Sequence, residues 1–209
     1  MKTKIMIIFI ILSCKSQSVE LYILRDISLS NPLIANDVFA KVAAQKIGER
    51  VNKLKNGDYV ISKTFGSRGL QHFSSKKERI TKQNQAKRVA HAIAALIRKS
   101  PELDGEGSTN LLSTLENSEW NCSQVSEIWF LTDGIEASTE VNPTDLINGK
   151  IILPDPYEPD FLKGCKVIFL GLSQTVGGSL TMKQTRNLRT AWKNWMKKAG
   201  ADFKAIINP

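Results

Sequence analysis

Residues 19–32 read VELYILRDISLSNP, and this stretch indicates the kind of fold. Its first part, Val19 to Leu24, is a short and mainly apolar run that leads to an acid, as expected of a central strand covered on both faces. Asp26, Ser28 and Ser30 then follow at alternate positions, and an extended backbone would place their oxygens on one side. The stretch therefore predicts a buried strand whose end carries one carboxylate and two hydroxyls.

Strands and helices alternate along the rest of the chain. Apolar residues at helical spacing predict helices over Asp37–Lys55 and Gln83–Lys99, a shorter one from Leu111, and a last one that opens at the capping box of Thr181 and closes at Gly200. Further strands are expected at Tyr59–Phe65, Leu70–Phe73, Glu127–Thr132, Lys166–Leu172 and Ala201–Ile207. This order predicts an α/β fold with a doubly wound, mostly parallel six-stranded sheet and helices on both faces.

One segment interrupts the alternation. Asn142 to Gly164 contains four prolines where a helix would be expected, so we predict an irregular surface loop there.

The first residues have the pattern of an export signal. A basic start is followed by a nine-residue apolar run, Ile5 to Ser13, which is short for a membrane-spanning helix. Ile11-Leu12-Ser13-Cys14 resembles the bacterial lipobox, which implies a signal peptide over residues 1–13 and lipid attachment at Cys14. We expect a short tether over residues 14–18, a domain over residues 19–209, and a lipoprotein anchored in the periplasm or at the cell surface. A plain secretory signal and an uncleaved anchor are the alternatives.

Composition and charge narrow the classes of partner. The 209 residues are 42% hydrophobic and 23% charged, which suits one globular domain. The net charge of +9, or +7 without Lys2 and Lys4, favours acidic partners or an anionic membrane surface. No interleaving of basic and aromatic residues of the kind that binds single strands stands out, so no nucleic acid is expected.

The last predicted helix is amphipathic. Trp192, Trp195 and Met196, with Leu188 and Ala199, form a stripe that we assign to the core. The opposite face carries five cations: Lys183, Arg186, Arg189, Lys193 and Lys197. We interpret these cations as a solvated face, with contact to a membrane as the alternative.

Three polar elements are expected at one edge of the sheet. They are Asp26-x-Ser28-x-Ser30, Thr109 in Gly107-Ser108-Thr109-Asn110, and Asp133 in Leu131-Thr132-Asp133-Gly134. Ligands of open α/β sheets bind outside the carboxyl ends of the strands, where two of these elements lie. Oxygen ligands with few formal charges suit a hard cation, Mg²⁺ or one of its substitutes Mn²⁺ and Ca²⁺.

These three elements, in this order, resemble the metal-ion-dependent adhesion site of von Willebrand factor type A domains. The resemblance spans residues 19–207 and implies a protein-binding module. It implies that Ser28, Ser30 and Thr109 coordinate the metal, and that Asp26 and Asp133 act through waters or hydrogen bonds. It also implies an open coordination position that an acidic residue of a protein partner fills.

Alternatives to this interpretation remain. A Mg²⁺-dependent hydrolase or phosphotransferase would use Asp26 as a nucleophile at the same edge, but Ser28 stands where such enzymes carry a second acid. In a third interpretation, the chain has this fold but no functional metal site, and its basic surface binds the partner. Glu136 is expected to be a solvated loop residue, with a further acid near the rim of the site as the alternative, and no Cys and His residues have zinc spacing.

Two cysteines precede two successive strands. Cys122 comes before Glu127–Thr132 and Cys165 before Lys166–Leu172. If these strands are neighbours, both thiols lie at the edge opposite the metal site, and outside the cytoplasm they tend to oxidise. The sequence thus predicts a disulfide between Cys122 and Cys165.

Overall fold

The computed structural model describes residues 18–67, 69–71, 77–123 and 126–208. The predicted signal peptide, Cys14 and most of the tether lie outside the described residues, and so do His72 and Phe73. Within the described ranges, no helix is both long and apolar enough to span a membrane.

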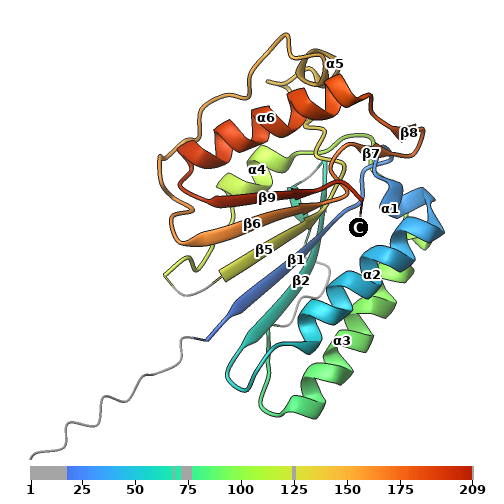
Figure 1. The fold of residues 1–209 in the computed structure, drawn as a ribbon, viewed down its shortest axis with the longest axis vertical. Helices are drawn as coiled ribbons and strands as arrows, with labels where there is room; N and C mark the ends of the chain where they lie inside the picture. Colours follow the sequence, from blue (N-terminus) through green and yellow to red (C-terminus); the bar gives the residue numbers. More distant parts are fainter. Residues whose placement is uncertain (1–17, 68, 72–76, 124–125, 209) are drawn as a thin grey trace, which may run out of the picture.

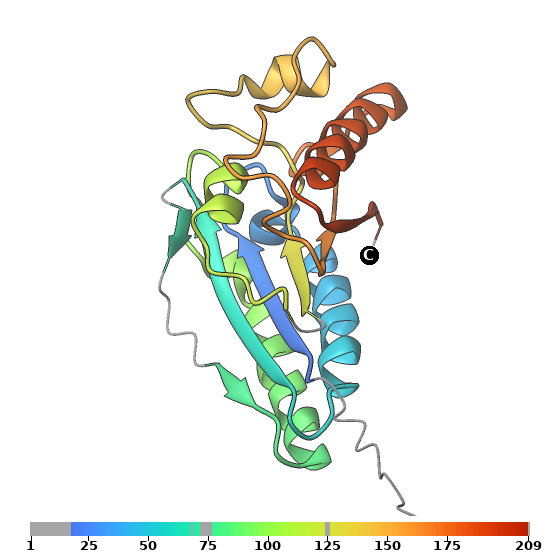
Figure 2. The same cartoon turned by 90° about the vertical axis from the view of Figure 1, so that its left-hand side faces the viewer.

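A central sheet of seven strands organises the described part of the chain. The strands are β1 (Glu20–Asp26), β2 (Tyr59–Gly66), β3 (Gly69–Gln71), β4 (Glu78–Arg79), β5 (Ser126–Leu131), β6 (Cys165–Leu170) and β9 (Asp202–Ile206). Their order is β3-β2-β1-β5-β6-β9, and β4 pairs with β2 beside this path. β1, β2, β5, β6 and β9 run parallel, with their carboxyl ends at one edge (Figure 2). The predicted mostly parallel α/β sheet is confirmed.

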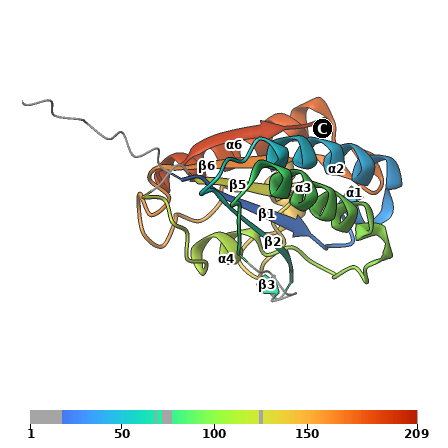
Figure 3. The same ribbon diagram turned by 90° about the horizontal axis from the view of Figure 1, so that it is seen from below.

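Helices cover both faces of the sheet (Figure 1). One face carries α2 (Asp37–Asn52) and α3 (Gln83–Arg98), which lie side by side (Figures 1 and 3). The other face carries α4 (Leu111–Glu116) and α6 (Met182–Lys198). The smaller elements are α1 (Pro32–Ala35), a 3-10 turn (Ser100–Glu102), α5 (Pro143–Ile147) and a hairpin of β7 (Gln174–Thr175) and β8 (Gly178–Ser179).

The alternation of side chains along β1 explains why both faces are covered. Leu21 and Ile23 belong to the core under α2 and α3, whereas Tyr22 and Leu24 belong to the core under α4 and α6. A strand that is apolar on both sides is stable only between two layers, because each exposed face would leave apolar area in water.

Two short helices were not predicted. The structure places α5 inside the segment Asn142–Gly164 that we expected to be wholly irregular, and it begins α1 directly after the polar end of β1. Both begin with an Asn–Pro pair, in which the Asn side chain accepts a backbone N–H and the proline is the first helical residue. The N–H of the first helical residue has no acceptor within the helix, so the N–H that proline lacks is not missed there. A proline at this position therefore starts a helix and does not break one.

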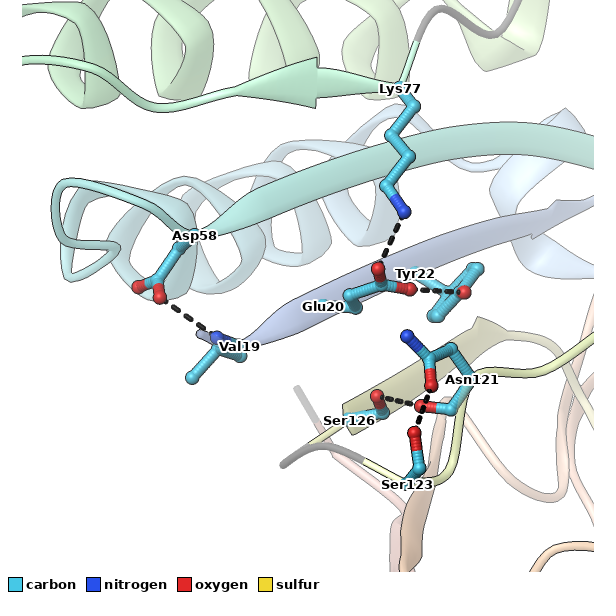
Figure 4. Close-up of polar contacts among 8 residues, drawn as sticks. All are labelled: Val19, Glu20, Tyr22, Asp58, Lys77, Asn121, Ser123 and Ser126. Atoms are coloured by element: carbon cyan, nitrogen blue, oxygen red, sulfur yellow. Dashed lines mark hydrogen bonds and ion pairs between the residues drawn. The ribbon is translucent and has the colours of Figure 1, made fainter. Parts of the chain in front are cut away.

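Polar contacts secure the amino-terminal start of β1 (Figure 4). The N–H of Val19 donates to Asp58 Oδ1 at 2.8 Å, and Glu20 accepts from Lys77 Nζ at 2.5 Å and from the Tyr22 hydroxyl at 2.7 Å. Burial raises the pKa of the Glu20 carboxyl, but these hydrogen bonds outweigh burial and hold the pKa below its usual value. The first residues of β1 are therefore held in place by hydrogen bonds and an ion pair.

A disulfide lies at this same edge. It joins Cys122, in the loop before β5, to Cys165, the first residue of β6, with 4.8 Å between the Cα atoms. Ser126 pairs with Cys165 in the sheet, so the bridge ties the entry of two neighbouring strands.

Replacing both cysteines, as Cys122→Ser/Cys165→Ser, should lower the free energy of unfolding by about 2–4 kcal/mol. The reason is that the bridge closes a loop of 43 residues and so restricts the unfolded chain. Denaturant unfolding of the oxidised chain and of the double variant measures the difference. Unchanged chain treated with reductant is the control and should behave like the variant. Equal midpoints with and without reductant would contradict the bridge.

Candidate metal centre

The carboxyl ends of β1 and β5 bring Asp26 and Thr132 together. Arg25 and Leu131 are paired in the sheet, so the next residue of each strand lies at the same edge. Asp26 is fully buried, and its Oδ2 accepts a hydrogen bond from the Thr132 hydroxyl at 2.7 Å. Its Oδ1 accepts the N–H of Ser28 at 2.8 Å. Both oxygens of this carboxylate are therefore held in place.

The two serines after β1 lie close together. Their hydroxyl oxygens are 3.3 Å apart, as the alternate spacing predicted. Asn31 fixes the turn that follows, since its side-chain amide donates to the carbonyl of Asp26 at 3.0 Å and to that of Leu131 at 2.9 Å. The serine segment is thus attached to the ends of both central strands.

Thr109 reaches the same place from a loop far away in the sequence. The loop is bound to the segment after β1 because Glu106 N–H donates to the Ile27 carbonyl at 2.8 Å and Leu29 N–H donates to the Glu106 carbonyl at 2.7 Å. Thr109 is buried, and its hydroxyl lies close enough to Asp26 to offset part of the rise that burial causes in the pKa of that carboxyl. The loop therefore adds a third hydroxyl.

Asp133 comes from the loop after β5 and is also fully buried. Its Oδ1 accepts the N–H of Ile135 at 2.8 Å, whereas its Oδ2 has no hydrogen-bond partner within the described ranges. The next residue must be glycine, because Gly134 has a φ of 76° and a Cβ there would lie 2.3 Å from Leu172 Cδ1. The indole N–H of Trp192 donates to the carbonyl of Gly134 at 2.7 Å, which ties this loop to α6.

Burial raises the proton affinity of both aspartates. Burial raises the pKa of Asp26 to about 6. Burial, followed by the nearby charge of Asp26, raises the pKa of Asp133 to about 7. No cation of the described chain forms an ion pair with either carboxylate, and the neighbouring Arg25 instead donates to the Leu96 carbonyl at 3.0 Å.

These residues fit a hard divalent cation. Two buried carboxylates without a cation, one of them with an unpaired oxygen, need a positive charge, and three hydroxyls supply neutral oxygen ligands. The described residues include no group of three or more His, Cys, Asp or Glu suited to a metal, so the site would depend on the hydroxyls of Ser28, Ser30 and Thr109. The structure thus brings all five predicted residues to one edge.

Glu136 was predicted wrongly as a solvated loop residue. It is fully buried, and its Oε2 accepts the N–H of Leu111 at 2.7 Å and the N–H of Leu112 at 3.1 Å. Burial raises its pKa to about 7. The sequence contains one signal for this role: the first turn of α4 has no acid of its own to face its unpaired N–H groups.

Glu136→Ala should lower the free energy of unfolding by about 1–3 kcal/mol, because the substitution leaves two buried N–H groups without an acceptor. Glu136→Gln is the matched control, since its amide oxygen keeps an acceptor and the buried charge is removed; we expect it to be as stable as the unchanged chain or more so. Thermal unfolding at pH 8 compares the three proteins. Equal losses in both variants would show that the carboxylate charge matters, and not the acceptor.

Comparisons with known proteins give distant likenesses. No protein-family model and no curated protein sequence matches the chain. Among solved structures it is similar to the conserved hypothetical protein BatB from Bacteroides thetaiotaomicron, with a TM-score of 0.46 and 16% identity over 92% of each chain. It is also similar to a von Willebrand factor type A protein from Catenulispora acidiphila (TM-score 0.48, 16% identity, 91% of this chain and 39% of that one).

A third likeness is to the pilus adhesin SpaC from Lactobacillus rhamnosus GG in an open conformation, with a TM-score of 0.48 and 10% identity over 92% of this chain and 28% of that one. The chain therefore spans less than half of two of these three proteins. The α/β architecture rests on the strand order described above and not on these overlays.

Proposed function

We propose that the chain is a divalent-metal-dependent protein-binding module, lipid-anchored through Cys14 on the bacterial envelope. One observation carries this proposal: Asp26 and Asp133 lie buried beside each other, without a cation from the described chain, under the hydroxyls of three residues. Such an arrangement costs free energy unless a positive ion joins it.

In this proposal Ser28, Ser30 and Thr109 hold Mg²⁺, or Mn²⁺ or Ca²⁺ in its place. The buried carboxylates of Asp26 and Asp133 balance part of the charge and orient the hydroxyls. Because the coordinating hydroxyls are neutral, the bound ion retains positive charge and attracts a further carboxylate. The partner is therefore a protein that offers an acidic side chain.

Hydrolysis is less well supported than binding. A nucleophilic aspartate needs a free oxygen, yet both oxygens of Asp26 accept hydrogen bonds and the side chain is fully buried. Ser28 cannot act as the acid and base that such a reaction requires. We therefore propose a binding role for this edge of the sheet.

Metal titration of the full chain tests the proposal. Mg²⁺ should raise the midpoint of thermal unfolding of the unchanged chain but leave Ser28→Ala/Ser30→Ala unaffected. Ser113→Ala, in α4, is the control and should respond as the unchanged chain does.

Pull-down from envelope extracts with Mg²⁺ or with chelator then tests partner binding. Indifference of the unchanged chain to Mg²⁺, Mn²⁺ and Ca²⁺ would refute the proposal, and phosphate-ester turnover lost in Asp26→Ala would support the hydrolase.

A further inference from the structure

Helix α6 carries charge of one sign only. Its 17 residues include six Lys or Arg and no Asp or Glu, and all six cations are exposed. The sixth, Lys198, forms an ion pair with Asp155. The other five are Lys183, Arg186, Arg189, Lys193 and Lys197, which we call the basic row; no acid of the described residues forms an ion pair with them.

The basic row faces away from the protein. Leu188, Trp192 and Trp195 of the same helix are buried in the core, so residues on the opposite side of the helix point outward. Successive members of the row are three or four positions apart, which places them along one side of the helix. At a rise of about 1.5 Å per residue, the row is about 21 Å long.

Most of this row adds little to the stability of the helix. Each adjacent pair of its members repels, because like charges three or four positions apart destabilise a helix. Lys183 lies in the first turn of α6, where the helix dipole disfavours a cation, whereas Lys197 lies in the last turn, where the dipole favours one. In contrast, α2 mixes Asp37 and Glu49 with its cations. A partner of opposite charge would offset the repulsion within α6.

Apolar side chains beside the basic row narrow the class of partner. Met182 begins α6 and is 84% exposed, and Ile152, on the segment that faces the carboxyl-terminal half of α6, is 80% exposed. A groove of about 400 Å³ lies between this segment and α6, and its lining includes Ile152, Ala191 and Lys197. Asp155 also lines this groove, where it is paired with Lys198 and not with the basic row. Cations together with protruding apolar side chains suit a lipid bilayer surface.

Nucleic acid fits this surface less well. Single strands bind basic grooves with aromatic side chains on which bases stack, but both tryptophans of α6 are buried. We propose that the basic row of α6 binds the surface of a bilayer that contains anionic phospholipid. This inference does not depend on the metal centre, because α6 contributes no hydroxyl or carboxylate to it.

Binding of the full chain to vesicles tests the inference. Vesicles of phosphatidylcholine alone are compared with vesicles that contain one third phosphatidylglycerol, at 0.1 M salt and with chelator present so that the metal centre plays no part. The amino-terminal segment is the same in every variant, so the readout is the ratio of affinities for the two vesicles. We expect the unchanged chain to prefer the anionic vesicles.

Charge-removing variants locate the surface. Arg186→Gln/Arg189→Gln/Lys193→Gln should reduce the preference about 100-fold, since each cation near an anionic surface contributes about fivefold. The matched control, Lys41→Gln/Lys87→Gln/Arg88→Gln, removes the same charge from exposed positions of α2 and α3 on the other face, and should change the preference less than about threefold.

Three results would overturn the inference. The first is that the unchanged chain shows no preference for anionic vesicles. The second is that the two triple variants lose the preference equally. The third is that the unchanged chain binds an oligo(dT) strand more tightly than anionic vesicles and that only the α6 variant loses this binding. The second would assign the effect to overall charge, and the third would assign the basic row to nucleic acid. Thermal unfolding of each variant checks that the fold is intact.

Discussion

Asp26→Asn should lower the affinity of the chain for Mg²⁺ by about a thousandfold and, at pH 8, raise the stability of the metal-free protein. The side chain keeps its shape, but the buried negative charge is lost. A divalent ion and a unit charge several ångströms apart attract by about 5 kcal/mol at an effective dielectric constant of 20, which exceeds the loss we predict. In the metal-free protein the same charge is unfavourable, because burial already raises the pKa of Asp26 to about 6.

Isothermal calorimetry with Mg²⁺ and denaturant unfolding in chelator measure the two effects. Asp202→Asn, at the exposed start of β9 on the opposite edge, is the control and should change neither quantity. The decisive result is a fall in Mg²⁺ affinity together with a rise in the stability of the metal-free protein. A variant that loses both affinity and stability would mean that Asp26 holds the loop together and that its charge has no special relation to a metal.

Metal-free protein should lose stability as the pH rises from about 4 to about 7, by an amount on the order of 5 kcal/mol. The folded pKa values of Asp26 and Asp133, about 6 and about 7, exceed the usual value of 3.8. The folded state therefore keeps protons that the unfolded state releases in this range, so its advantage is full below pH 4 and is lost above pH 7. Glu136, with a pKa of about 7, adds to the same trend.

Saturating Mg²⁺ should cancel most of this loss, since the ion binds the ionised carboxylates of the folded state only. The stabilisation by Mg²⁺ should then be largest above pH 7 and small near pH 4. Denaturant unfolding at several pH values, with Mg²⁺ and with chelator, gives both curves. A metal-free protein whose stability rises between pH 4 and pH 7 would contradict the raised pKa values.

Much of the fold could be predicted because its signals are local. The apolar strands, the amphipathic helices and the capping box of Thr181 and Gln184 appear in the structure within a few residues of their expected bounds. The helix α5 was missed because the prolines of Asn142–Gly164 were interpreted as breaks, although Asn142-Pro143 serves as a helix start, as Asn31-Pro32 does for α1. A proline has either meaning, and only the residues around it in space decide between them.

The candidate site could be predicted in part for a related reason. Asp26, Ser28 and Ser30 lie in one short segment, and the strand order places Asp133 beside them. Glu136 could not be found in this way, because the groups it contacts, at the start of α4, are 24 and 25 residues away in the sequence. An isolated acid in a loop has no local pattern that tells a buried helix cap from a solvated side chain.

The position of β1 has a mechanical consequence. This strand runs from the edge where the described chain begins to the edge where Asp26 lies, with β2 on one side and β5 on the other. In the binding mode that we propose, a force that pulls on a partner at Ser28 and Ser30, against a point that holds Ser18, is transmitted along the covalent backbone of one strand. The pull would not have to peel the sheet apart or unfold a helix, so the module could sustain tension with its fold intact.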